Sequence, residues 1–305
     1  MDEGARCDTA VELCFLRPLS KDQLPNLVLL VFGKTDLQGE FATAVRSEWR
    51  FPSIPISMPY ALPQRFHIVH MDIKYIICLF IHILQISRKA SRKDPSGALS
   101  SWNTSTHFCW WKGVMCTTAR PFRVSTLNLS AQSLAGEITS SLANLTFLRA
   151  LDLSSNRFFG RFPLLNHLQH LGFLYMNDNS LDGIISDTLT NCSKLTQIDL
   201  SNNQLQGAIP PRIGSLEYLN LGNNSLTGII PATIGNLVKF GYLNLGMNNL
   251  TGIIPATVEN LTLLTVLRLE YNQFEGKIPD GVWQLANLTY LLLGQNRLSG
   301  GFHRP

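Results

Sequence analysis

Leucines recur at fixed intervals through the second half of the chain, and they alternate locally with polar residues. The stretch from Leu219 to Leu237 reads LNLGNNSLTGIIPATIGNL, and the stretch from Leu243 to Leu261 reads LNLGMNNLTGIIPATVENL, with 15 of 19 positions identical. Because side chains alternate between the two faces of a strand, each L-x-L segment predicts a short strand with its leucines pointing inward. One unit cannot bury its leucines alone, so the pattern predicts a stack of coils.

An asparagine marks the same place in nearly every unit of the pattern L-x-x-L-x-L-x-x-N-x-L-x-G-x-I-P. We expect it to turn the chain and to bond the backbone of the adjacent coil. Glycine permits a backbone conformation that other residues resist, and Ile-Pro sets an extended segment on the far side. Eight units, the last incomplete, follow spacings of 24, 23, 24, 21, 24, 24 and 24 residues. The first unit has Gln132 at this place, and the predicted ladder comprises Asn156, Asn179, Asn203, Asn224, Asn248, Asn272 and Asn296.

These units resemble the plant-specific class of leucine-rich repeat, which is marked by L-x-G-x-I-P. The resemblance covers Val124 to about Gly301. It implies an α/β solenoid: a right-handed leucine-rich repeat superhelix with short parallel strands on its inner face, preceded by an irregular N-terminal extension. Residues 124–301 are therefore expected to form eight repeats, the last cut short.

One unit is shorter than the others. Between Asn203 and Asn224 the chain lacks three residues of the usual connector, after the letters IGSL. Two interpretations stay open: a tolerated loop deletion, which we favour, or a local kink in the solenoid near residues 214–218.

A segment rich in tryptophan and cysteine precedes the repeats. Residues 94–116 read DPSGALSSWNTSTHFCWWKGVMC and resemble the N-terminal cap of plant leucine-rich repeat receptors. The resemblance assigns a cap to residues 94–123 and implies a disulfide between Cys109 and Cys116, hence an oxidising compartment. The preceding LQISRKASRK keeps little of the apolar helix face that the family has there. We therefore expect the first coil to be poorly covered.

The first ninety residues differ from the rest. Residues 71–90 contain an apolar run too short for a comfortable membrane span, and we interpret them as signal-peptide-like; the alternative is a short membrane segment. Residues 1–70 form an irregular extension of doubtful function. Within them, Leu27 to Phe41 fits the repeat pattern without its asparagine, as a repeat remnant or a wrongly joined exon would.

Composition adds few constraints. A net charge of +4 with 15% charged residues is too small to indicate nucleic acid binding. No nucleophile elbow, phosphate loop or zinc-protease motif occurs, and no kinase motif occurs, so we expect no catalysis, no cofactor and no metal. His167 and His170 are interpreted as a surface pair and Cys192 as a buried thiol.

The outward positions of the strands are the places free to carry function. Stacking turns them into columns that mix aromatic, acidic, amide and basic side chains, as interaction hot spots do. The candidate ligand-binding residues are Phe173, Tyr175, Tyr218, Asn220, Tyr242, Asn244, Arg268 and Tyr290.

Glycosylation triplets N-x-S/T agree with passage through the secretory pathway. Asn128 also has the triplet but falls on an inner strand. The predicted sites are Asn103, Asn144, Asn191, Asn223, Asn249, Asn260 and Asn287. The expected location is the outer face of the plasma membrane, the extracellular space or the cell wall.

The resemblance implies the ectodomain, or a truncated part of one, of a plant leucine-rich repeat receptor-like protein. Such a protein binds a peptide or protein ligand, with a co-receptor of similar ectodomain as a further partner. Membrane association is expected only through the hydrophobic N-terminal segment or a missing C-terminal span. Two alternatives stay open: a secreted inhibitor of microbial cell-wall hydrolases, and a non-functional receptor gene fragment. The sequence beyond Pro305 would discriminate between them.

Overall fold

The computed structural model describes residues 94–103, 105–212 and 215–299. Contacts divide the chain into Met1–Ile68 and Val69–Pro305, and all described residues belong to the second unit. The extension of residues 1–70 and the signal-like segment of residues 71–90 therefore lie outside the described residues and stay predictions.

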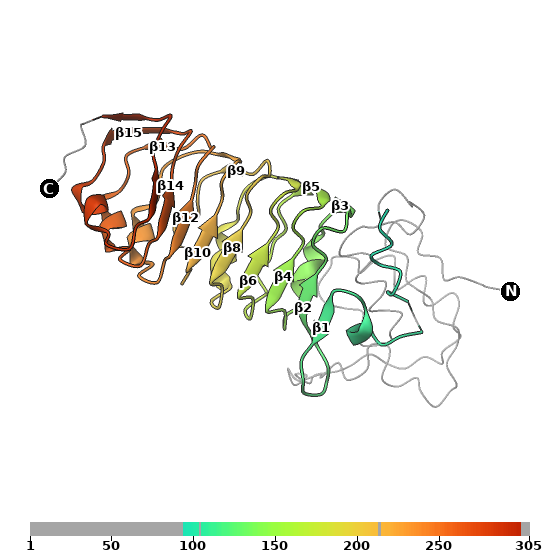
Figure 1. The fold of residues 1–305 in the computed structure, drawn as a ribbon. Helices are drawn as coiled ribbons and strands as arrows, with labels where there is room; N and C mark the ends of the chain where they lie inside the picture. The colour runs from blue at the N-terminus through green and yellow to red at the C-terminus, as the bar shows by residue number, and fades with distance from the viewer. Residues whose placement is uncertain (1–93, 104, 213–214, 300–305) are drawn as a thin grey trace, which may run out of the picture. The chain divides into compact units, whose positions relative to one another are not determined.

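Short strands from successive coils lie side by side in one sheet (Figure 1). Its nine strands follow the order β1-β2-β4-β6-β8-β10-β12-β14-β16. All neighbours are parallel except β1 and β2, which form an antiparallel pair in the cap. The strands are β1 (Val114–Cys116), β2 (Val124–Asn128), β4 (Ala150–Asp152), β6 (Phe173–Tyr175), β8 (Gln197–Asp199), β10 (Tyr218–Asn220), β12 (Tyr242–Asn244), β14 (Val266–Arg268) and β16 (Tyr290–Leu292). This stack confirms the predicted leucine-rich repeat solenoid.

After the inner strand and the turn that follows it, each coil adds a second short strand. These make three small parallel sheets, β3-β5-β7, β11-β9 and β13-β15-β17. The glycine of L-x-G-x-I-P lies within or beside these strands with positive φ, as at Gly252 with φ 76°. The strands are β3 (Ala135–Glu137), β5 (Arg157–Arg161), β7 (Ser180–Asp182), β9 (Gln206–Gly207), β11 (Ser225–Leu226), β13 (Thr251–Gly252), β15 (Gln273–Lys277) and β17 (Arg297–Ser299).

The helices of the described part are all 3-10 helices, not α-helices. The ones in the coils span five residues each, and Pro231, Pro255 and Pro279 cap the last three. So short a segment has no room for several α-helical hydrogen bonds, and 3-10 turns suit such short connectors. The helices are η2 (Phe108–Trp110), η3 (Ser140–Asn144), η4 (Asp187–Asn191), η5 (Ala232–Asn236), η6 (Ala256–Asn260) and η7 (Asp280–Gln284).

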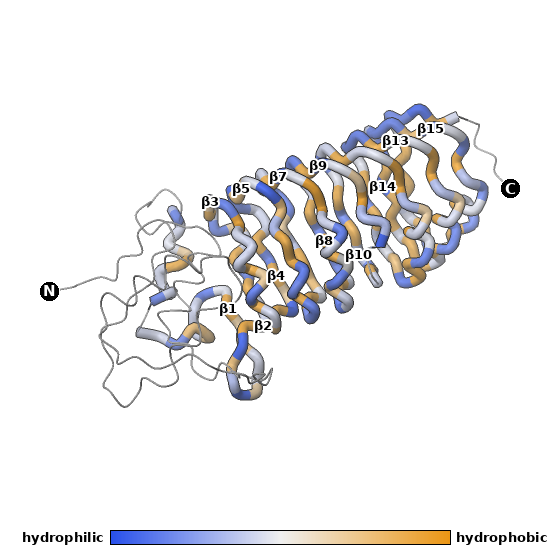
Figure 2. Tube along the Cα trace, turned by 180° about the vertical axis from the view of Figure 1, so that it is seen from behind, coloured by the Kyte–Doolittle hydropathy of each residue, from blue (hydrophilic) through white to orange (hydrophobic). Residues whose placement is uncertain are grey.

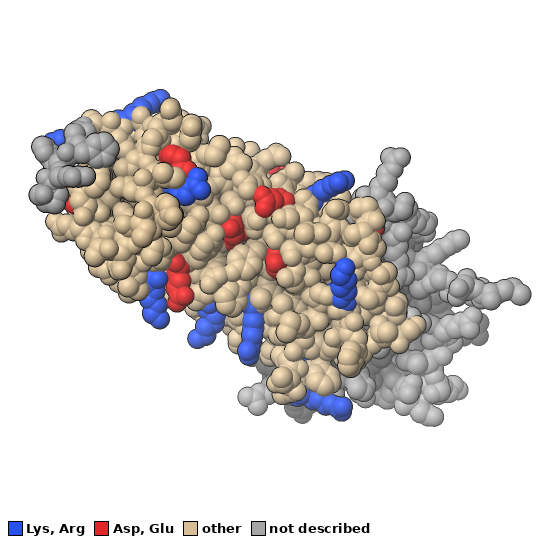
Figure 3. All heavy atoms as spheres, in the orientation of Figure 1, with Lys and Arg blue, Asp and Glu red and all other residues tan. Residues whose placement is uncertain are grey.

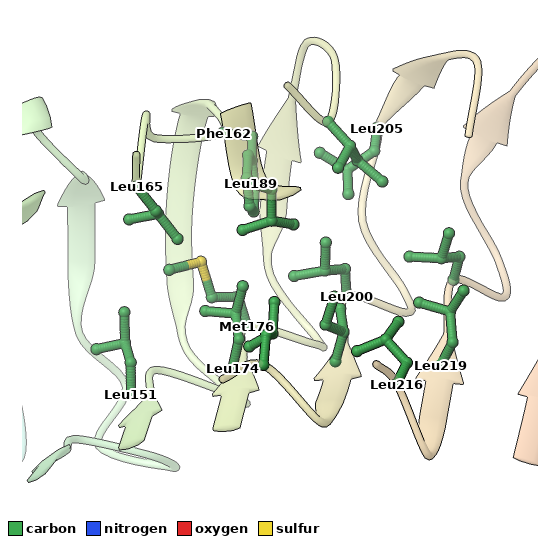
Figure 4. Packing of buried hydrophobic residues seen from close by; sticks show 14 of the residues in the cluster. Leu151, Phe162, Leu165, Leu174, Met176, Leu189, Leu200, Leu205, Leu216 and Leu219 are labelled. Atoms are coloured by element: carbon green, nitrogen blue, oxygen red, sulfur yellow. The ribbon is translucent and has the colours of Figure 1, made fainter. Parts of the chain in front are cut away.

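The leucines of successive coils form one continuous core (Figure 4). Leu174, Leu219 and Leu243 of the inner strands are at most 1% exposed. Figure 2 shows hydrophobic and hydrophilic residues following one another along the coils. Fully burying a leucine contributes about 1.5–3 kcal/mol.

The ladder asparagines join each coil to the one before it. The Asn248 amide donates to the carbonyl of Leu221 in the preceding coil, at 3.0 Å, and to those of Leu245 and Gly246 in its own coil. Its oxygen accepts the Leu226 N–H at 2.9 Å. One side chain thus satisfies four backbone groups in the turn. The other ladder asparagines make corresponding bonds, for example at Asn179, Asn203 and Asn272.

The shortened unit leaves the inner sheet intact. Strand β10 pairs in register with β8 on one side and β12 on the other, so Tyr218 lies opposite both Gln197 and Tyr242. The described residues of the outer connector, up to Arg212, form no helix. The missing residues therefore come from the connector, as expected of a tolerated deletion.

The cap closes the first coil with tryptophans. Cys109 and Cys116 form a disulfide with Cα atoms 5.5 Å apart. Trp102 and Trp111 stack with ring centroids 5.3 Å apart, and both are buried in the same cluster as Leu127 and Leu129. Leu127 and Leu129 are 0% and 2% exposed, so the expectation of a poorly covered first coil is wrong. The buried tryptophan pair supplies apolar area at this end of the stack, where the chain keeps little of an apolar helix face.

We expect Asn248→Ala to lower the free energy of unfolding by about 1–3 kcal/mol, because it leaves buried backbone groups without partners. Urea denaturation measures the change. The matched control is Asn249→Ala. Asn249 is the exposed neighbour of Asn248, and its side chain accepts a single hydrogen bond, from Gln273. That control should cost less than about 0.5 kcal/mol. Equal losses in the two variants would contradict a structural role for the ladder.

Candidate ligand-binding face

The parallel pairing places the outward strand residues in two rows, which we call the inner face. Paired residues of neighbouring strands point to the same side of a sheet, so each row runs from coil to coil. Row one contains Ala150, Phe173, Gln197, Tyr218, Tyr242, Val266 and Tyr290. Row two contains Asp152, Tyr175, Asp199, Asn220, Asn244, Arg268 and Leu292. All eight candidate residues thus lie on one surface.

The candidates differ in exposure. Phe173 and Tyr290 are 41% and 65% exposed, while Asn244 is only 8% exposed. The Asn244 amide lies in the space that a Cβ at Gly222 would occupy, and its oxygen accepts the Gly246 N–H at 3.0 Å. Asn244 therefore supports the backbone and offers little surface to a ligand, which its place in the strand could not reveal.

Asp199 organises the centre of the inner face. One of its oxygens accepts Tyr218 Oη at 3.1 Å and Asn220 Nδ2 at 3.0 Å. The other accepts the backbone N–H and the hydroxyl of Ser201. Hydrogen bonds to a carboxylate are stronger than neutral ones, so these side chains are held in place before any ligand arrives.

Tyr218 and Tyr242 stack on neighbouring coils, with ring centroids 4.5 Å apart and planes 14° apart. The Tyr175 hydroxyl donates to Gln197 in the next coil. Burial raises the pKa of Tyr218, and the charge of Asp199 raises it further. Burial, followed by the charges of Asp152 and Asp199, raises the pKa of Tyr175. Both hydroxyls therefore stay protonated at neutral pH and act as donors.

Arg268 is paired within its own coil. Its Nε and Nη2 both donate to one oxygen of Glu270, whose side chain is 9% exposed. This hydrogen bond is the main reason that the pKa of Arg268 is raised. Glu270 lies over Gly246, where a Cβ would come within 2.8 Å of its carboxyl carbon. The pair is close to neutral, so Arg268 brings little net charge to the inner face.

Three exposed side chains add to the eight candidate residues. Met115 of the cap pairs with Thr126 and is 63% exposed, so it extends row one beyond the repeats. Met247 and Tyr271 precede ladder asparagines with φ of 56° and 55°, and are 49% and 57% exposed. A signal for the last two was available, because the residue before each ladder asparagine holds the same place in every unit, in the turn that follows the inner strand.

The sequons occupy several surfaces. Asn144, Asn191 and Asn260 end the helices η3, η4 and η6. Asn223 precedes a ladder asparagine beside the inner face, and Asn103 is half-buried. Asn249 and Asn287, like the others apart from Asn103, are exposed.

The remaining reactive groups show no second site. Cys192 is buried, and burial raises its pKa to about 11, so it is a poor nucleophile at neutral pH. Among the described residues no three His, Cys, Asp or Glu side chains gather as metal ligands would. Helices in this part of the chain are also too short or too polar to cross a membrane.

Comparisons with known proteins agree with this geometry. Residues 85–117 match the leucine rich repeat N-terminal domain, and residues 194–216, 215–237 and 241–298 match leucine rich repeats. The receptor kinase-like protein Xa21 of rice is 48% identical over 77 residues, which cover 23% of this chain and 7% of Xa21. The chain therefore belongs to the leucine-rich repeat proteins.

Solved structures narrow the resemblance. The crystal structure of PEPR1–AtPEP1 superposes with a TM-score of 0.66 and 31% identity, covering 73% of this chain and 31% of that one. The Arabidopsis receptor kinase HAESA, in complex with the peptide hormone IDA and the co-receptor SERK1, superposes with a TM-score of 0.58 and 29% identity. This match covers 74% of this chain and 42% of that one. The cap and repeats are thus similar to the ectodomains of plant receptor-like kinases, and the chain spans less than half of each relative.

A spectroscopic titration can check the environment of Tyr218. Its raised pKa means that the folded state favours the protonated phenol. This contribution to stability is complete below the ordinary tyrosine pKa of 10.0 and is lost as pH rises through the folded value. We expect Tyr218→Phe to remove one late step from the tyrosinate absorbance curve of the folded protein. The control Tyr271→Phe removes an exposed phenol and should leave that late step in place.

Proposed function

We propose that this chain is a ligand-binding leucine-rich repeat ectodomain, or part of one, from a plant receptor-like protein. Its ligand is a peptide or a protein segment that lies across the inner face. The observation that carries the proposal is the pair of rows, which together present aromatic and hydrogen-bonding side chains on one surface over seven coils. The complex of HAESA with the peptide hormone IDA supports it, because that ectodomain shares the fold.

The physical case rests on preorganisation. Tyrosine gives a large contact area at a small cost in side-chain entropy, and aromatic residues are enriched in interface hot spots. Here the Tyr218 hydroxyl is already bonded to Asp199 and its ring is stacked on Tyr242. These side chains are therefore already ordered in the free protein, so binding a ligand costs little additional side-chain entropy.

The remaining assignments follow from this function. A co-receptor with a similar ectodomain would be a second partner, as SERK1 is for HAESA. The disulfide agrees with an oxidising compartment and a place on the outer face of the plasma membrane or outside the cell. Membrane attachment, glycosylation at the seven sequons and the absence of catalysis are parts of the same proposal. We favour this function over a secreted hydrolase inhibitor and over a non-functional fragment.

The double variant Tyr218→Ala/Tyr242→Ala tests the face. Loss of two hot-spot aromatics should weaken peptide binding by about thirty-fold, equivalent to about 2 kcal/mol. The probe is a set of peptides selected on the wild-type ectodomain from a displayed library of secreted plant peptides. Affinity is measured by calorimetry, and circular dichroism melting shows whether the fold is kept.

The matched control is Val238→Ala/Leu263→Ala, which removes exposed apolar area from the turns before β12 and β14. This control should bind as the wild type does. A folded tyrosine variant with unchanged affinity for every selected peptide would exclude these two tyrosines from the binding surface.

A further inference from the structure

The inner face has a charge opposite to that of the chain. The whole chain carries +4, yet Asp152 and Asp199 lie in row two. Directly before the strands, Arg149 at β4 and Glu217 at β10 have opposite charges, so the flanking positions do not cancel the acidity of row two. Figure 3 shows acidic atoms along the middle of this surface and basic side chains along its lower border. Of the outward residues in rows one and two, Arg268 alone is basic, and Glu270 neutralises it.

The charged residues surround an aromatic patch. Across β4, β6 and β8, row two reads Asp152, Tyr175, Asp199, and the register places Phe173 next to Tyr175 on the same strand. Strands lie about 4.8 Å apart, so the Cα atoms of the two aspartates are about 10 Å apart, with the tyrosine on the strand between them. Phe173 is 41% exposed, which leaves its ring available for contact.

The two carboxylates are not equivalent. Asp199 accepts four hydrogen bonds, two at each oxygen, which uses the capacity of a carboxylate. Asp152 accepts two from Ser154 at Oδ1, but at Oδ2 its one donor among the described residues is Asn128 Nδ2, at 3.2 Å. Asp152 Oδ2 therefore has room for one more donor. Burial is the main cause of the raised pKa of Tyr175, and the charges of Asp152 and Asp199 raise this pKa further.

We infer that the peptide segment lying over β4, β6 and β8 carries a lysine or arginine side chain. The inference rests on the proposed function and names the chemistry of its ligand. The aliphatic stem of the basic side chain packs on Phe173, and its cationic head lies over the Tyr175 ring and donates to Asp152. Such a head gains both cation–π and charge-assisted hydrogen-bond energy, while an acidic side chain would be repelled.

A selection experiment tests this inference. The probe is a displayed library of random linear peptides, from which we keep clones that bind the wild-type ectodomain and fail to bind Tyr218→Ala/Tyr242→Ala. These clones should be enriched in lysine and arginine relative to the unselected library. Asp152→Asn, which keeps the shape of the side chain, should weaken their binding by about three- to ten-fold. The matched control Glu275→Gln removes the same charge from β15, outside the inner face, and should leave binding unchanged.

A second measurement does not depend on the folding of any variant. In a selected peptide, the basic residue is replaced by norleucine or glutamine, and binding to the wild-type protein should fall by a similar factor. The inference is overturned if the clones show no enrichment in basic residues. It is also overturned if neither Asp152→Asn nor the peptide replacement changes binding. In both cases the proposed function stands. If no clone depends on the two tyrosines, inner-face peptide binding itself fails, and this inference fails with it.

Discussion

The structure depends on the contact between each coil and the next. A coil has too few residues to enclose its own leucines, so it buries them only against its neighbours. Stacking buries backbone groups in the turn after each strand, where no strand pairing satisfies them. The ladder asparagines form hydrogen bonds with these groups. The four bonds of Asn248, two of them to the preceding coil, show how one amide both completes a turn and sets the distance between coils.

The contact between successive coils also makes the inner face rigid. Since the coils cannot slide, the outward residues of neighbouring strands stay in register, and side chains from different coils can form fixed groups. The Asp199 carboxylate, bonded to Tyr218 and Asn220 of the next coil, is such a group. The shortened coil does not disturb it, because β10 keeps its pairing on both sides. Variation in length is confined to the connectors, where no side chain of the face originates.

Much of this could be predicted from the repeat alone. The leucines, the asparagines and the two outward rows follow from period and spacing, because those residues are constrained by local geometry that is the same in every coil. Other features required contacts between distant residues. The cap covers Leu127 with stacked tryptophans, and Met115 joins row one through an antiparallel strand outside the repeat pattern. The helices of the coils are 3-10 with or without a capping proline, because a five-residue length leaves no room for several α-helical hydrogen bonds.

The sequence by itself determined the class of fold, the direction in which each leucine points and the surface left free for binding. A period repeated in every unit carries that information, since each unit meets the same neighbours. Only the tertiary structure decided which outward residues are available. It buried Asn244 over Gly222, paired Arg268 with Glu270, saturated Asp199 and left Asp152 with an open oxygen. These outcomes depend on which side chains of adjacent coils meet, and position within a repeat contains no information about that.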